Sequence, residues 1–318
     1  MNRRIIFMGT PPFAVASLNA LMDARMEVVA VVTAPDRPAG RGRQLRMSAV
    51  KERALELGLP VLQPDKLRDP GFLAQLDALN ASLYTVVAFR MLPEAVWNRP
   101  ALGCVNLHAS LLPDYRGAAP VNWALIHGEK RTGVSTFLIG ATIDTGDVML
   151  REETDIGPDE DAGALHDRLM AIGAALLTRT VKDIFDGTAS SIPQSDVGAG
   201  QTRPAPKLTR ENSRIDWSAP ARQVHDLVRG LAPSPGAWTL WTRSGVPDEM
   251  LKVLRTRLVT GRHKAMPPGE VVVSDGKLLV QCGKGMVEAA TVQAQGKRPM
   301  DGEDFVRGLR DREGVLLV

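Results

Sequence analysis

The sequence predicts an α/β domain built on a doubly wound, Rossmann-like sheet, followed by a small OB-like β-barrel domain. The first prediction depends on apolar runs at Arg4–Met8, Glu27–Thr33 and Ser82–Phe89, which alternate with stretches of helical spacing. Apolar strands interleaved with helices are typical of a parallel sheet covered on both faces, and right-handed crossovers make such a sheet doubly wound. The barrel prediction depends on short strand-like runs beyond Pro206. These runs are separated by turns such as Asp275-Gly276.

The periodicities of strands and of helices also predict the other elements of the first domain. We expect strands at Pro60–Leu62, Gly103–His108 and Gly133–Gly140, and helices at Val50–Leu57 and Phe72–Leu79. A longer amphipathic helix is predicted over Gly163–Gly187, because apolar side chains recur at three- and four-residue spacings at Leu165, Leu169, Ile172 and Leu176.

A stretch rich in Ser, Gly and Pro divides the chain. It has no apolar period, so we expect a catalytic domain at 1–189, a linker at 190–206 and the barrel domain at 207–318. The barrel domain begins with a helix, Pro220–Leu231, with proline at its start. The strands expected after it are Trp238–Thr242, Leu251–Val259, Glu270–Ser274, Lys277–Gln281 and Met286–Val292.

Composition indicates a soluble globular protein. Hydrophobic residues make up 44% of the 318 residues and charged residues 24%, with a mean hydropathy of -0.08. The apolar run near the start is too short for a signal peptide, and no run is long enough to span a membrane, so we expect a cytoplasmic protein. Two cysteines, Cys104 and Cys282, are too few for a disulfide framework or a cysteine-based zinc site.

Charge is distributed unevenly along the chain. Residues 207–318 hold 18 basic and 13 acidic residues, a net charge of +5, whereas residues 1–206 carry a net charge of -2. Within the acidic part, Pro35–Arg53 holds six basic and two acidic residues. A basic second domain and a basic Gly-rich loop favour a polyanionic partner. A solvated surface with scattered charge would explain the same counts.

A dinucleotide is not expected, in spite of the Rossmann-like pattern. The first strand leads into Gly9-Thr10-Pro11-Pro12, which is not the G-x-G-x-x-G fingerprint. Proline lacks the backbone donor that a pyrophosphate needs. The hypothesis that the chain is a nicotinamide-dependent dehydrogenase is therefore supported by the fold class alone.

Three polar residues lie at or just beyond the carboxyl ends of predicted strands, where open α/β sheets bind ligands. Asn106 and His108 lie two apart on one strand and so share a face, and Asp144 lies in a turn after the next strand. An amide, an imidazole and a carboxylate suit acyl-group transfer, with Asn and His donating to an oxyanion and Asp orienting His. Taken singly, His108 is equally explained by a bond to a backbone carbonyl, and Asp144 by a turn cap.

Longer motifs surround these three residues. The runs NLHASLLPDYRGAAP and IDTGD, at their separation here, resemble the folate-dependent formyltransferases, and the resemblance extends through nearly the whole chain. The runs MGTPPFA, APDRPAGRG and PKLTRENSRIDW are most similar to the members that act on charged tRNA. The resemblance implies transfer of the formyl group of 10-formyltetrahydrofolate to the methionine amine of initiator methionyl-tRNA, for translation initiation. We expect no metal, because Cys104 and His108 lack two further ligands, and we expect no membrane and a monomer.

The resemblance also assigns residues. Asn106, His108 and Asp144 match the catalytic trio, and the loop beside tetrahydrofolate matches Ser110, Leu111, Leu112 and Pro113. The tRNA is expected on the basic loop that contains Arg37, Arg41 and Arg43. One departure concerns Ala88–Pro93. The family has an Ala-Tyr-Gly stretch ahead of Leu-Pro in this region, which lines the pterin pocket, and the segment is one residue shorter here.

Other candidates have weaker support. Cys104 is better explained as a buried thiol than as a nucleophile, and His166 and His225 stand in no motif. His263 belongs to a basic turn, and core packing is the default for the tryptophans. Two alternatives remain open: a formyltransferase for a nucleotide-linked amino sugar, which needs no basic domain, and a nucleic-acid-binding relative without catalysis.

Overall fold

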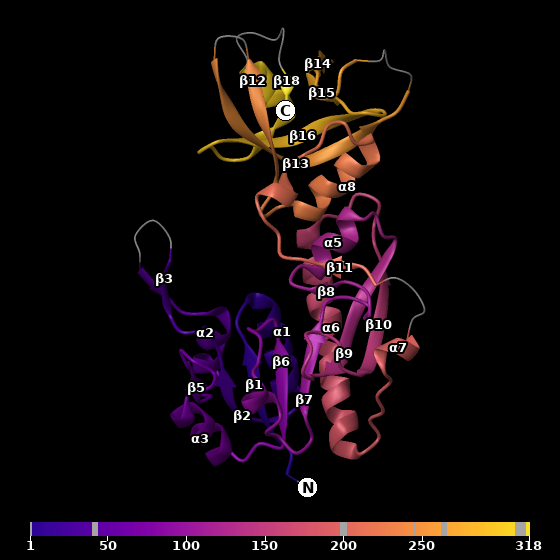
Figure 1. Cartoon of the computed structure of the whole chain (residues 1–318). Helices are drawn as coiled ribbons and strands as arrows, with labels where there is room; N and C mark the ends of the chain where they lie inside the picture. Colours follow the sequence, from indigo (N-terminus) through magenta and orange to yellow (C-terminus); the bar gives the residue numbers. More distant parts are fainter. Residues whose placement is uncertain (1, 40–43, 198–201, 244–245, 262–265, 309–315) are drawn as a thin grey trace. The chain divides into compact units, whose positions relative to one another are not determined.

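The computed structural model describes residues 2–39, 44–197, 202–243, 246–261, 266–308 and 316–318 (Figure 1). The chain divides into two compact units that are not contiguous in the sequence. The first consists of residues 1–117, 132–154 and 166–204, and the second of residues 118–131, 155–165 and 205–318.

A seven-stranded sheet forms the centre of the first unit. Its strand order is β10-β9-β7-β6-β1-β2-β5. The strands are β1 (Arg4–Gly9), β2 (Glu27–Val32), β5 (Val61–Leu62), β6 (Leu83–Val87), β7 (Cys104–His108), β9 (Arg131–Leu138) and β10 (Val148–Asp155). The pairs β1–β2, β1–β6, β2–β5 and β6–β7 are parallel. The α/β, Rossmann-like prediction is thereby confirmed, with one difference: β9 runs antiparallel to β7.

Helices cover both faces of this sheet, which is why its inner strands are apolar on both sides. The helices of the unit are α1 (Pro12–Asp23), α2 (Ala49–Glu56), α3 (Pro70–Ala78), α4 (Glu94–Trp97), α6 (Ala162–Asp186) and α7 (Gln194–Val197). On one face, Phe72 and Leu76 of α3 pack with Ile6 of β1 and Tyr84 of β6. On the other, α6 approaches β7 so closely that a Cβ on Gly173 would lie 2.8 Å from a side-chain carbon of Leu107.

Local sequence explains where these helices begin. The Ser48 hydroxyl accepts a hydrogen bond from the Lys51 N–H at the start of α2, and Asp69 caps α3 in the same way. Such caps satisfy N–H groups that have no partner in the first turn. No helix in the described ranges is long and apolar enough to cross a membrane.

An antiparallel sheet and one amphipathic helix form the core of the second unit. The sheet has the order β14-β15-β16-β13-β12-β18, and β17 pairs with β16. A bridge between Glu270, just before β14, and Leu316 of β18 joins the two ends, so the sheet closes as expected for a small barrel. The strands are β12 (Ala237–Arg243), β13 (Val246–Val259), β14 (Val271–Ser274), β15 (Lys277–Gln281), β16 (Met286–Ala294), β17 (Met300–Asp301) and β18 (Leu316–Leu317).

Helix α8 (Ala221–Leu231) follows Pro220, as the sequence predicts. Its buried Val224, Val228 and Leu231 join a core with Leu251 and Val253 of β13. The unit also contains α5 (Pro120–Ile126), α9 (Gly302–Arg307) and the single-turn helix Glu211–Ser213.

Two segments predicted as loop or linker have local structure. The basic loop is a hairpin of β3 (Arg37–Ala39) and β4 (Gln44–Arg46) in its described part. The predicted linker contains α7 and β11 (Pro204–Ala205), and Ile192 within it forms a bridge with Val148. Although rich in Ser, Gly and Pro, the segment has buried side chains, among them Gln194. Strand β8 (Arg116–Gly117) lies just after the predicted site loop.

Candidate active site

The carboxyl ends of three neighbouring parallel strands define one edge of the sheet. Strand β1 ends at Gly9, β6 at Val87 and β7 at His108, and in the parallel pairs Gly9 is in register with Val87. Asn106 and His108 stand on the same face of β7, because alternate residues of a strand point the same way. The Asn106 amide is partly exposed and makes no hydrogen bond within the described part of the chain. It is therefore available to a ligand.

His108 is almost fully buried, at 7% exposure, and is held by the loop that follows it. Its Nε2 donates a hydrogen bond of 2.8 Å to the carbonyl oxygen of Tyr115. Since a carbonyl only accepts, this bond places the proton of the neutral ring on Nε2 and leaves a lone pair on Nδ1. Nε2 is therefore bonded to a backbone carbonyl, as expected for a histidine with a structural role. Nδ1 has a different neighbour.

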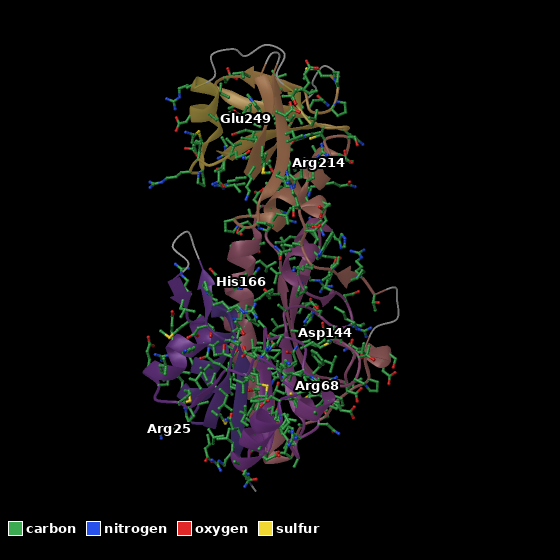
Figure 2. All side chains as sticks on the ribbon, turned by 60° about the vertical axis from the view of Figure 1, so that its left-hand side comes forward. Arg25, Arg68, Asp144, His166, Arg214 and Glu249 are labelled. Carbon is green, nitrogen blue, oxygen red and sulfur yellow. The ribbon has the colours of Figure 1, made fainter. Side chains whose placement is uncertain are left out.

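That neighbour is Asp144. Its Oδ2 lies 4.0 Å from Nδ1 of His108 and accepts a hydrogen bond of 3.0 Å from the Gly117 N–H. Asp144 belongs to the turn between β9 and β10 and is labelled in Figure 2. Its φ of 52° is in the left-handed region, which Asp tolerates better than most residues. The structure thus brings His108 and Asp144 together from distant parts of the sequence.

Close backbone packing fixes the rest of this turn. A Cβ on Gly146 would lie 1.6 Å from the carbonyl oxygen of Leu138, so no larger residue fits there. The Leu138 N–H donates to the carbonyl of Asp147 at 3.0 Å. The turn is therefore built against β9, and Asp144 projects from a constrained backbone.

The four residues predicted beside the folate differ in what they can offer. Ser110 and Leu112 are completely buried. The Ser110 hydroxyl donates to the carbonyl of Asp114, and the Leu112 N–H donates to the Ser135 hydroxyl. Leu111 and Pro113 are partly exposed. Ser110 and Leu112 thus stabilise the loop, while Leu111 and Pro113 keep accessible apolar surface.

The weaker candidates have structural surroundings. Burial raises the pKa of the Cys104 thiol far above its usual range, which suppresses the nucleophilic thiolate. His166 packs edge-on against Phe13. His225 is 2% exposed and bonds to the Thr256 hydroxyl, and burial lowers its pKa. His263 lies outside the described residues. Among those that are described, no group of His, Cys, Asp and Glu is placed to hold a metal ion.

The predicted tRNA contacts are only partly visible. Arg37 is exposed on β3, whereas Arg41 and Arg43 lie outside the described residues. A second group of basic side chains surrounds a tryptophan, for which the sequence predicts only core packing. Trp238 of the second unit is half-buried, and the guanidinium carbons of Arg210 and Arg214 lie 4.9 and 5.5 Å from its ring centroid. An aromatic face beside exposed arginines is typical of nucleic-acid contacts.

Gln194, which is 4% exposed, is a further residue near the site that the sequence does not predict. It contacts the Asp144 turn and Arg116 through its side-chain amide. No motif surrounds Gln194 in the sequence. The only available signal was its place in a run that the sequence pattern assigns to a linker.

The sequence matches the models of two known protein families. Residues 3–181 match the model of the formyl transferase family, and residues 207–310 match that of the formyl transferase C-terminal domain. The first match covers more than half of the chain and includes Asn106, His108 and Asp144. The chain belongs to the formyl transferase family and is an enzyme of that class.

Curated relatives indicate which formyl transferases the chain is similar to. The chain is 43% identical to the methionyl-tRNA formyltransferase of Bacteroides thetaiotaomicron, over 99% of this chain and 98% of the relative. It is 45% identical to the methionyl-tRNA formyltransferase of Parabacteroides distasonis, over 96% of each. These matches extend across both units and include residues 207–318, which carry the net charge of +5.

Solved structures show the same fold at much lower identity. The Helicobacter canadensis N-formyltransferase, solved with folinic acid and dTDP-3-aminofucose, has a TM-score of 0.64 at 15% identity, covering 93% of this chain and 99% of that one. HypX from Aquifex aeolicus, solved with tetrahydrofolic acid, has a TM-score of 0.62 at 16% identity, covering 96% of this chain and 47% of that one. These two structures support the fold class.

Proposed function

We propose that this enzyme transfers the formyl group of 10-formyltetrahydrofolate to the free amino group of methionine on initiator methionyl-tRNA. The observation that carries the proposal is the pairing of His108 and Asp144 beside Asn106 at the carboxyl edge of the sheet. The full-length similarity to methionyl-tRNA formyltransferases supports the acceptor. The match of 3–181 to the formyl transferase family supports the reaction class.

The chemical step is attack of the neutral methionine amine on the formyl carbon of the donor. A C–N bond forms, the formyl oxygen becomes an oxyanion, and the amine nitrogen becomes positively charged. His108 accepts a proton from this nitrogen at Nδ1, because Nε2 is occupied by the Tyr115 carbonyl. Asp144, 4.0 Å away, then stabilises the imidazolium.

Collapse of the tetrahedral intermediate completes the transfer. The Asn106 amide donates to the oxyanion, and once protonated, Nδ1 of His108 is also a donor. The bond from the formyl carbon to N10 of the folate then breaks, and N10 takes up the proton that His108 received. Formylmethionyl-tRNA and tetrahydrofolate are the products, with no net gain or loss of protons.

The folate is expected against Leu111 and Pro113, whose partly exposed side chains offer an apolar wall to the pterin. The buried hydrogen bonds of Ser110 and Leu112 hold this wall in place. No charged side chain is among these four residues, so we expect donor affinity to depend weakly on salt.

The tRNA is expected on the two basic elements. One is the basic segment of the sequence with Arg37, Arg41 and Arg43, whose arginines suit phosphates and whose glycines suit close approach. The other is the domain 207–318, with a net charge of +5 and with Arg210 beside Trp238. Neither element is needed to bind a small nucleotide-linked amino sugar.

An acceptor comparison tests the proposal. The purified enzyme is given 10-formyltetrahydrofolate labelled in the formyl group, and either initiator methionyl-tRNA or a dTDP-linked amino sugar. We expect label on the aminoacyl ester of the tRNA and none on the sugar. Label on the sugar alone would show that the chain is a sugar N-formyltransferase. No transfer to either acceptor would support the non-catalytic alternative.

A further inference from the structure

We propose that Gln194 is a positioning residue for the reaction, which sets the backbone of the Asp144 turn and so the approach of Asp144 to His108. The inference rests on the catalytic roles proposed above for these two residues. It assigns a function to a segment that the sequence marks only as a connection between domains.

The hydrogen bonds of Gln194 fix how its amide is oriented. Its Oε1 accepts from Nε and Nη2 of Arg116 at 2.9 and 2.5 Å. Its Nε2 donates to the carbonyls of Asp144 and Gly146 at 2.9 and 2.8 Å. If the amide were flipped, its NH2 group would face the N–H donors of Arg116 and its oxygen would face the two carbonyl oxygens. Only the observed orientation therefore forms hydrogen bonds. Both lone pairs and both protons of the amide are used, in a side chain that is 4% exposed.

The backbone delivers Gln194 to this position. Ile192 exchanges two hydrogen bonds with Val148, at 2.8 and 2.9 Å, just after the Asp144 turn. Two residues later the chain begins α7 with Gln194. The side chain therefore enters the turn from a segment that is itself anchored to the start of β10.

Gln194 bridges two segments of the chain, the Asp144 turn and strand β8, which contains Arg116. Asp144 has a left-handed backbone, and its carboxylate accepts from the Gly117 N–H. Arg116 is the residue before Gly117. Gln194 thus ties the Asp144 turn to the strand that supplies the donor for its carboxylate. Loss of its two donated bonds would free the turn, and displacement of a reacting group by about 1 Å costs as much as 10²-fold in rate.

Substitution by glutamate distinguishes the role of the amide nitrogen of Gln194 from that of its oxygen. Gln194→Glu keeps the size of the side chain and an oxygen acceptor for Arg116, but it loses both donated bonds. It also places a carboxylate oxygen opposite the carbonyls of Asp144 and Gly146. The neighbouring Ser195→Ala is the matched control, since Ser195 is exposed and its hydroxyl bonds only to Asp196 among the described residues.

The test is a double-mutant cycle in kcat with initiator methionyl-tRNA, using Gln194→Glu, Asp144→Ala and the double variant. We expect Gln194→Glu to lower kcat by about 10- to 100-fold, with the KM of both substrates unchanged. In the Asp144→Ala background it should have no further effect, because the group that it positions is gone. Ser195→Ala should equal the wild type.

Two results would overturn the inference: wild-type kcat in Gln194→Glu, or the same fold loss with and without Asp144. Wild-type kcat in Asp144→Ala is a separate outcome, which refutes the catalytic role of Asp144 and with it the basis of this proposal. If Gln194→Glu does not fold, as judged by circular dichroism, Gln194→Met takes its place in the same cycle.

Discussion

Replacement of His108 by glutamine separates catalysis from stability at the centre of the site. In the wild type, Nε2 donates to the Tyr115 carbonyl, and Nδ1 faces Asp144. The amide nitrogen of glutamine can take the place of Nε2, but nothing replaces Nδ1. We therefore expect His108→Gln to lose the proton acceptor while it keeps the structural hydrogen bond.

The expected magnitudes follow from those two contacts. Removal of a positioned acid–base group or an oxyanion donor typically costs about 10²–10³ in turnover, so kcat should fall by that factor in both His108→Gln and His108→Ala. Stability should separate the two variants. Alanine removes the hydrogen bond that Nε2 of His108 donates to the Tyr115 carbonyl, and loss of such a bond costs about 0.5–1.5 kcal/mol.

Single-turnover formylation of initiator methionyl-tRNA gives the rate of the chemical step, and urea unfolding gives the stability of each variant. The predicted pattern is a slow but stable His108→Gln and a slow and destabilised His108→Ala. A His108→Gln enzyme that reacts at the wild-type rate would refute the role of Nδ1. Equal stability losses in the two variants would refute the assigned role of Nε2.

Three further predictions concern other parts of the chain. Asn106→Ala should lower kcat by about 10²–10³ with donor affinity unchanged, as measured by fluorescence titration with folate; weaker folate binding at normal kcat would place Asn106 in the donor site instead. Arg41→Gln with Arg43→Gln should raise the KM for charged tRNA and flatten its log–log salt dependence by about one unit per lost phosphate contact. Unaltered tRNA kinetics at moderate salt would remove this loop from the interface. Because burial raises the pKa of the Cys104 thiol and brings that of Cys282 to about 12, iodoacetamide at neutral pH should label both only after unfolding, and rapid labelling of the native enzyme would contradict this.

Periodicity was sufficient to predict six of the seven strands of the first sheet, together with helices α2, α3 and α6. The expected strand Gly103–His108 is observed as Cys104–His108, and the expected helix Gly163–Gly187 as Ala162–Asp186. Strand β10 escaped prediction, because five of its eight residues, Arg151–Asp155, are polar or charged and mostly exposed. An edge strand with one solvated face lacks the apolar run that marks a buried one.

The site shows a different limit. The sequence could place Asn106 and His108 on one face of a strand, because that is a local property. It could not show that Nε2 of His108 donates a hydrogen bond to the Tyr115 carbonyl, because this depends on how the loop turns back towards β7. It also could not reveal Gln194, whose partners lie 48 to 78 residues away. Polar contacts between distant segments leave no period in the sequence.

Discrimination between two methionyl-tRNAs tests the central claim most directly. Initiator and elongator methionyl-tRNA carry the same amine on the same ester, so a difference in kcat/KM measures recognition of the tRNA itself. With 10-formyltetrahydrofolate as donor, we predict that the initiator is formylated with the higher kcat/KM and that its product is N-formylmethionyl-tRNA by mass spectrometry. Equal kcat/KM for the two tRNAs, or no formylation of either, would contradict the proposed function.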